Sequence, residues 1–99
     1  MYNVEVTNTA WEHLMEHTRF IANVSRSAAT QFVADFREIT GSLSEMPERC
    51  SWLQHSEIPF EKYRKIMIDK YHMVLFQISG KTVYITAVVD CRKEYSWLL

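Results

Sequence analysis

The segment that decides the fold runs from Tyr63 to Leu99, YRKIMIDKYHMVLFQISGKTVYITAVVDCRKEYSWLL. It contains three runs that are rich in branched and aromatic residues, which suit a pleated, half-buried sheet. These runs cover Tyr63–Ile68, Tyr71–Ile78 and Thr82–Val89, separated by Asp69-Lys70 and by Ser79-Gly80-Lys81. Because such short breaks are long enough only for hairpins, the segment predicts a three-stranded antiparallel meander.

The register of the meander decides which side chains share a face. A two-residue turn at Asp69-Lys70 would set Ile68 opposite Tyr71 and Arg64 opposite Leu75. Side chains alternate between faces along a strand, so one face, which we assign to the core, holds Tyr63, Lys65, Met67, Val74, Phe76, Ile78, Val83, Ile85, Ala87 and Val89. The other face holds Arg64, Ile66, Ile68, Met73, Leu75, Gln77, Tyr84, Thr86, Val88 and Arg92. This second face is too apolar for plain solvent, which indicates a partner surface, cover by a helix, or a register shifted by one residue.

The N-terminal half predicts a strand and two helices. Tyr2–Thr7 alternates as a short strand does. Three-to-four spacing of apolar residues predicts helices over Ala10–Val24 and Ser27–Leu43, the first begun by a Thr9–Glu12 capping box and the second by Ser25 or Ser27. The predicted fold is therefore α+β, with an antiparallel helix hairpin packed on one face of an antiparallel sheet of about four strands.

Length and charge limit the possible functions. Ninety-nine residues predict a single domain, residues 1–99. The net charge of −1 disfavours general nucleic-acid binding, although six of the eleven basic residues lie in or beside the meander: Lys62, Arg64, Lys65, Lys70, Arg92 and Lys93. We find neither a signal-peptide profile nor an apolar run of membrane length, so we expect a cytoplasmic protein without membrane contact. Cys50 and Cys91 are expected to be free thiols in a reducing compartment.

The histidines do not predict a metal site. His13 and His17 are one helical turn apart, but the acid between them is displaced from the HExxH pattern and no third ligand follows at a fixed spacing. We expect both to face solvent, with no metal and no cofactor. His55 lies in a long connection, PERCSWLQHSEIPF, which is either functional or pinned by its own apolar residues.

The order of strand, helix hairpin, long loop, meander and charged aromatic tail resembles the RelE/ParE superfamily of bacterial type II toxins over the whole chain. The most specific part is the ending, which is similar to a subgroup with the pattern D-C-R-x-x-Y-x-W-L, here Asp90, Cys91, Arg92, Tyr95, Trp97 and Leu98. The resemblance implies a growth-inhibiting toxin of the plasmid-stabilisation kind. It also implies a toxin–antitoxin hetero-oligomer with a cognate antitoxin.

Two mechanisms are implied by the superfamily. RelE-like members cut mRNA on the ribosome without a metal, and that role would fall on Arg64, Arg92 and Tyr95, with Lys62, Lys65 and His72 as secondary candidates. The sequence departs from this pattern in the third strand, where Met73 stands at the position of an Arg, and a methionine cannot hold a phosphate. The departure favours the ParE-like mechanism, which is noncatalytic binding to DNA gyrase.

A third interpretation from another class is a noncatalytic interaction module unrelated to toxicity, with Arg64, Arg92 and Tyr95 as contacts at the rim of its interface. For either toxin, we expect the antitoxin to engage the outer sheet face through an added helix or strand. The expected contacts are apolar residues that need cover: Ile66, Ile68, Met73, Leu75, Tyr84 and Trp97.

Overall fold

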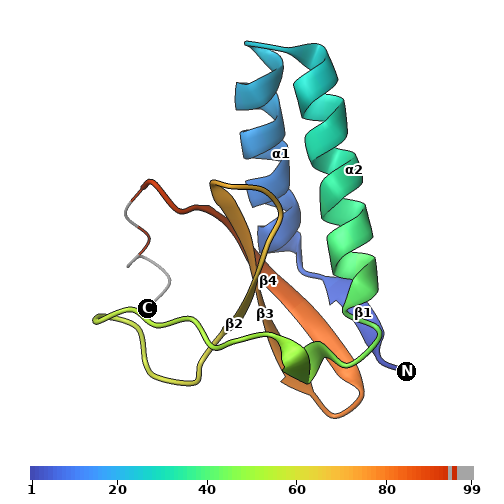
Figure 1. Cartoon of the computed structure of the whole chain (residues 1–99), viewed down its shortest axis with the longest axis vertical. Helices are drawn as coiled ribbons and strands as arrows, with labels where there is room; N and C mark the ends of the chain where they lie inside the picture. The colour runs from blue at the N-terminus through green and yellow to red at the C-terminus, as the bar shows by residue number, and fades with distance from the viewer. Residues whose placement is uncertain (94, 96–99) are drawn as a thin grey trace.

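A computed structural model, which describes residues 1–93 and 95, contains the predicted α+β architecture. Strand β1 (Asn3–Val6) leads into helix α1 (Asn8–Ala22) and helix α2 (Arg26–Ser42), which form an antiparallel hairpin (Figure 1). A short 3₁₀ helix, η1 (Pro47–Arg49), and a long loop precede strands β2 (Arg64–Met67), β3 (His72–Ser79) and β4 (Thr82–Asp90). In the part of the chain described, we find no helix long and apolar enough to cross a membrane.

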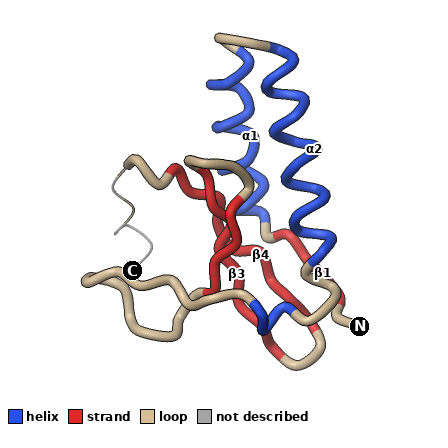
Figure 2. The backbone as a smooth tube through the Cα atoms, viewed as in Figure 1, coloured by secondary structure: helices blue, strands red, loops and turns tan. Residues whose placement is uncertain are grey.

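The four strands form one mixed sheet in the order β1-β4-β3-β2 (Figure 2). The meander β2-β3-β4 is antiparallel, as predicted, whereas β1 pairs with β4 in parallel. Helix α1 packs on β4 and α2 packs on α1. This arrangement places β4 in the interior of the sheet with the helix hairpin beside it.

The helices begin where side-chain oxygens accept backbone hydrogen bonds. Thr7, not Thr9, caps α1, since its Oγ1 accepts from the backbone N–H of Ala10 at 3.2 Å. The predicted capping box is therefore wrong by two residues, because the chain turns into the helix directly after β1. Ser25 caps α2 by accepting from the N–H of Ala28 at 3.1 Å, which is one of the two predicted caps.

The predicted register of the first hairpin is wrong by one residue. Arg64 pairs with Phe76, and Met67 pairs with Met73. Four residues, Ile68–Tyr71, separate the end of β2 from the start of β3. The physical reason is Asp69, whose carboxylate accepts from the backbone N–H groups of Tyr71 and His72 at 2.8 Å each. A turn closed by these side-chain hydrogen bonds needs more residues than the predicted two-residue turn. In consequence Ile66 and Ile68 pack with the helix side, whereas Tyr63, Lys65 and Met67 do not belong to that core.

A β-bulge in β4 changes which residues share a face. Leu75 pairs with Ala87 and Phe76 pairs with Ile85, so Thr86 is the extra residue. Its Oγ1 donates to the carbonyl of Leu75 at 3.1 Å. After the bulge the alternation is reversed: Val88 packs in the helix-side core, whereas Ala87 and Val89 pack on the opposite face. The predicted faces of these three residues are therefore wrong.

The second face of the sheet is covered by the chain itself. Leu53 and Ile58 of the long loop, with Tyr63, form a second apolar cluster with Met73 and Leu75. Met73 is only 3% exposed and Leu75 is fully buried. The expectation that this face is open for a partner is wrong, because the long loop covers it. The loop is held in place by its own apolar residues, which is one of the two alternatives predicted for it.

Candidate functional site

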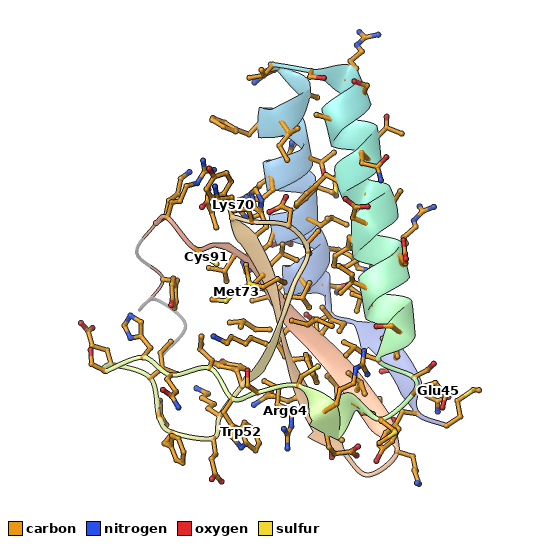
Figure 3. All side chains as sticks on the ribbon, in the orientation of Figure 1. Glu45, Trp52, Arg64, Lys70, Met73 and Cys91 are labelled. Carbon is orange, nitrogen blue, oxygen red and sulfur yellow. The ribbon has the colours of Figure 1, made fainter. Side chains whose placement is uncertain are left out.

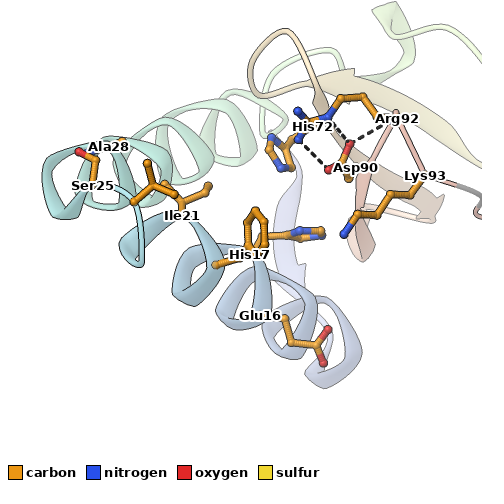
Figure 4. Close-up of a pocket in the computed structure, with 11 residues that line it drawn as sticks. Glu16, His17, Ile21, Ser25, Ala28, His72, Asp90, Arg92 and Lys93 are labelled. Carbon is orange, nitrogen blue, oxygen red and sulfur yellow. Dashed lines mark hydrogen bonds and ion pairs between the residues drawn. The ribbon is translucent and has the colours of Figure 1, made fainter.

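The most specific polar arrangement lies at the end of β4, where the charged tail begins (Figure 4). Arg92 donates to the Asp90 carboxylate twice, from Nε at 3.0 Å and from a terminal nitrogen at 2.9 Å. Its guanidinium also lies 4.2 Å from the ring centre of Tyr71. The Asp90 side chain is 6% exposed and that of Arg92 is 54% exposed, so a buried carboxylate holds a cationic group at the surface in a fixed orientation.

The bond from Arg92 has an electrostatic consequence for Asp90. The side-chain hydrogen bond from Arg92 is the largest influence and lowers the pKa of Asp90 from 3.8 to about 2, although burial acts in the opposite direction. The backbone N–H of Arg92 donates to the same carboxylate at 2.9 Å. Asp90 is therefore ionised throughout the physiological pH range, and its charge compensates the charge of Arg92.

A group of rings lies beside this ion pair, between α1, α2 and β3. His72 is buried and contacts Asp69, with Nδ1 3.0 Å from the carboxylate. Its ring centre is 4.8 Å from that of Phe32 and 5.2 Å from that of His17. His72 is thus a packed side chain at the start of β3, with little surface available to a substrate.

The expectation that His13 and His17 face solvent is wrong. Nε2 of His17 lies 3.0 Å from the Val88 carbonyl, and the Val88 N–H donates to Nδ1 of His13 at 3.3 Å. These bonds arise because β1 pairs with β4 only up to Ile85. The two histidines of α1 therefore satisfy backbone groups of β4 that the short first strand does not reach.

Burial changes the protonation of these histidines. Desolvation is the largest influence on both, and it lowers the pKa of His13 and of His17 below the ordinary value of 6.5. Glu12 and Glu16 oppose the shift at His13, while the neighbouring His72 adds to it at His17. The neutral form of each ring is favoured in the folded protein.

A pocket of about 350 Å³ opens between this polar group and the free end of the helix hairpin. Its polar wall is formed by His17, His72, Asp90 and Arg92, and its apolar wall by Ile21 and Ala28 (Figure 4). Among residues 1–93 and 95, no group of three or more His, Cys, Asp or Glu side chains has the geometry to hold a metal ion.

The structure does not bring Arg64 to this site. Arg64 lies at the start of β2, where its guanidinium stacks 3.9 Å from the ring centre of Trp52 (Figure 3). It donates to the carbonyl of Cys50 at 2.7 Å and to that of Glu48 at 3.2 Å. Arg64 thus ties the long loop to the sheet edge. Arg64 pairs with Phe76, whereas Asp90, which holds Arg92, pairs with His72. Arg64 and Asp90 are therefore offset by four residues along β3, or about 13 Å.

Tyr95, Lys62 and Lys65, the other predicted catalytic residues outside the pocket, have contacts of their own. The Tyr95 ring is 5.0 Å from the ring of His55, and Tyr95 packs against the loop-side cluster. The ammonium of Lys62 lies 5.3 Å from the ring centre of Tyr63. Lys65 is near Cys91, where its charge partly opposes the rise in the thiol pKa that burial causes.

The predicted partner-binding residues differ in exposure. Ile68, Met73 and Leu75 are buried, Ile66 is half-buried, and Tyr84 is 37% exposed. Trp97 lies outside the described residues. A partner can reach Tyr84 directly, whereas contact with Met73 and Leu75 would require the long loop to move.

Sequence reasoning missed the partners of Arg92. Asp90 is the last residue of β4, and its spacing of two residues from Arg92 was a usable signal. Tyr71 and His17 come from distant parts of the chain, and only the register of β3 and the packing of α1 bring them to the site.

Comparison with known proteins gives a consistent result. Residues 4–95 match the family model described as the ParE toxin of the type II toxin–antitoxin system, parDE. A solved structure described as the chromosomal ParDE TA system from P. aeruginosa matches with a TM-score of 0.71 and 18% identity, covering 91% of this chain and 96% of that chain. At this identity the second match supports the fold. No curated protein matches the chain.

Proposed function

Because the chain belongs to the ParE toxin family of type II toxin–antitoxin systems, we propose that it arrests growth by binding DNA gyrase when it is free of its antitoxin. The action is a noncatalytic binding event, and it needs neither a cofactor nor a metal. The observation that carries this choice is that each arginine already donates to a group of the toxin itself. Arg64 donates to a loop carbonyl beside Phe76 of β3, and Arg92 donates to Asp90, which pairs with His72 four residues away on the same strand.

A ribonuclease needs a different arrangement. Cationic donors must converge on one phosphate to stabilise the charge that develops in the transition state. Here the guanidinium of Arg64 is occupied by loop carbonyls and the ring of Trp52, and that of Arg92 by Asp90. Lys65, which pairs with Leu75, lies on the other face of the sheet, and that face is filled by Met73 and Leu75 beneath the long loop. A phosphodiester would therefore meet an apolar layer on that face.

The same geometry suits a binding anchor. Arg92 is held by Asp90 and supported by the Tyr71 ring, so little side-chain freedom is lost when a partner contacts it. Lys70 and Lys93 lie nearby, each with its ammonium about 5.6 Å from an aromatic ring. Arginine and aromatic groups that are fixed before binding are typical of interface hot spots. We place the gyrase contact at this end of the sheet, with Arg92 as its anchor.

One contact favours a second candidate function. His55 and Tyr95 lie ring to ring at 5.0 Å, and both residue types can transfer protons. An mRNA endonuclease that used this pair would act on the loop side of the sheet, away from Arg92. It would leave cut RNA after induction, which gyrase inhibition would not.

The growth response of cells separates the two candidates. We expect induction of the free toxin to activate the DNA-damage response while translation continues at first, and coexpression of the antitoxin should prevent the effect. Rapid arrest of translation with fragmented mRNA, and without a DNA-damage response, would assign the protein to the ribonuclease mechanism.

A further inference from the structure

The pocket beside Arg92 has an apolar wall that meets solvent. It has a volume of about 350 Å³ and lies between the free end of the helix hairpin and the end of β4 (Figure 4). Phe20, Ile21 and Val24 of the hairpin line it, and Phe20 is 66% exposed and Val24 85% exposed. Cavities that bind ligands measure about 300–1,000 Å³, so this pocket has room for one large side chain.

The apolar wall is open because the hairpin is longer than the sheet beside it. Nε2 of His17 lies 3.0 Å from the carbonyl of Val88, and β4 ends two residues later, at Asp90. The part of the hairpin that follows His17 extends past the end of the sheet (Figure 1). Phe20 and Val24 belong to that extension, four residues apart. Their side chains therefore form an apolar surface above the end of β4.

Two cationic side chains form the opposite wall. Arg92 and Lys93 line the pocket, and both are exposed. A guanidinium has five N–H donors, and Asp90 accepts from only two nitrogens of Arg92. The ammonium of Lys93 lies 5.6 Å from the ring centre of Phe20, and no carboxylate of the described residues forms an ion pair with it. Both side chains therefore retain donors for an anionic group.

The acids of the pocket determine where such a group can lie. The described lining residues include two acids, Glu16 and Asp90. The Asp90 side chain is 6% exposed and is bound by Arg92. Glu16 lies on the far side of His17 from Arg92 (Figure 4). An anionic group is therefore favoured beside Arg92 and Lys93 and disfavoured beside Glu16, which restricts the orientation of a partner.

We propose that this pocket receives a large apolar side chain of DNA gyrase, with an adjacent acidic residue of gyrase that contacts Arg92 and Lys93. The proposal rests on the proposed function for the identity of the partner, and it extends the contact at Arg92 into a recognition site of defined chemistry. Arg92 is itself part of the pocket wall, so a partner that reaches this anchor also covers Phe20 and Val24. Anchor side chains that fill pockets are common at interface hot spots.

A substitution that fills the pocket tests the proposal. Ala28 of α2 lines the pocket and is exposed, so Ala28→Trp should occupy the space and leave the pair of Asp90 and Arg92 in place. We expect its affinity for purified gyrase to fall by roughly 30-fold or more, the range of an interface hot spot. Ala34→Trp is the matched control, because Ala34 is exposed on the same helix and does not line this pocket. The affinity of this control should equal that of the wild type.

A charge reversal tests the cationic wall independently. Lys93→Glu should weaken gyrase binding and reduce its salt dependence, because the reversed charge repels the acidic residue of the partner. Lys81→Glu is the matched control. The Lys81 ammonium also lies over an aromatic ring, 5.0 Å from the ring centre of Tyr2, but Lys81 is in the turn between β3 and β4, at the other end of these strands. Its reversal should leave gyrase binding unchanged.

Thermal unfolding and antitoxin affinity of each variant complete the test. Folded Ala28→Trp and Lys93→Glu variants that bind gyrase as tightly as the wild type would overturn the proposal, and so would an equal loss of affinity in Ala34→Trp. Loss of antitoxin binding at unchanged gyrase affinity would also overturn it and assign the pocket to the antitoxin. If Ala28→Trp does not fold, Lys93→Glu decides. A wild-type toxin that does not bind gyrase refutes the proposed function itself, and this occupant with it, before any variant is compared.

Discussion

The guanidinium of Arg92 binds the carboxylate of Asp90 through two hydrogen bonds, of 3.0 and 2.9 Å, and this pair fixes the most specific residue of the charged tail. A catalytic arginine stabilises the charge that develops on its substrate through donors aimed at that charge, and two nitrogens of Arg92 already donate to Asp90. An anchoring arginine gains from being held before the partner arrives. The pair therefore favours a binding role for this end of the sheet.

Removing the arginine should release the carboxylate. In Arg92→Ala we expect the pKa of Asp90, measured by NMR titration, to rise from about 2 toward or above its ordinary value of 3.8. Because the folded pKa is lowered in the wild type, the pair stabilises the fold above pH 4, and this contribution is lost as the pH falls toward 2. Arg92→Lys should restore only part of the shift, since an ammonium cannot reproduce the two-bond fork. An unchanged Asp90 pKa in Arg92→Ala would contradict this account.

The histidines of α1 predict a pH-dependent stability. The pKa values of His13 and His17 are lowered in the folded state, so the unfolded chain binds more protons near and below pH 6.5. We therefore expect the free energy of unfolding to decrease as the pH falls from 7 to 5. Denaturant titrations at several pH values measure this slope.

A double variant tests the origin of that slope. His13→Asn keeps an acceptor near Nδ1 and His17→Gln keeps a donor near Nε2, so both bonds to Val88 can form without a titrating ring. The variant should show a flatter profile than the wild type. Equal slopes for the two proteins would exclude the helix histidines as the cause.

Arg64 is expected to stabilise the long loop. Arg64→Ala removes the bonds to the carbonyls of Cys50 and Glu48 and the stacking on Trp52, and should cost about 1–3 kcal/mol of stability. Hydrogen exchange should increase in the loop, with less change in the helices. Lys62→Ala, which leaves these contacts in place, is the control. Faster exchange of the whole chain by the same factor would mean that Arg64 does not act on the loop in particular.

The buried face of the sheet gives a further prediction. Leu75 is fully buried beneath the loop, so Leu75→Ala should cost about 2–5 kcal/mol. Leu75→Asp should prevent stable folding, because it buries an unpaired charge. Tyr84→Asp, at a half-exposed position, should fold. A folded Leu75→Asp protein with a near-native unfolding temperature would show that the loop does not cover the sheet.

Much of the fold was predictable from local patterns. Branched and aromatic runs between short breaks specified the meander, and the Ser25 cap preceded α2 as one of the two expected options. The faces of the sheet were predictable only in part. The turn around Asp69 and the bulge at Thr86 each insert a residue relative to simple alternation, and each depends on a hydrogen bond that no period in the sequence reveals.

The site was less predictable because its contacts join distant segments. Arg92 was singled out from its motif, yet its partner Tyr71 depends on the length of the first hairpin loop. His13 and His17 were assigned to solvent, because nothing local indicates that β1 ends at Val6. Val88 pairs with Val74 of β3, but it has no strand partner on its β1 side. Tertiary contacts decided these positions.

The measurement that tests the central claim most directly compares purified toxin in two reactions, gyrase-catalysed DNA supercoiling and translation of a defined mRNA on ribosomes. We predict that wild-type toxin inhibits supercoiling and leaves the mRNA intact at every concentration, and that Arg92→Ala raises the inhibitory concentration by roughly 30-fold. Cleavage of the mRNA at discrete positions, with supercoiling unaffected, would contradict the account.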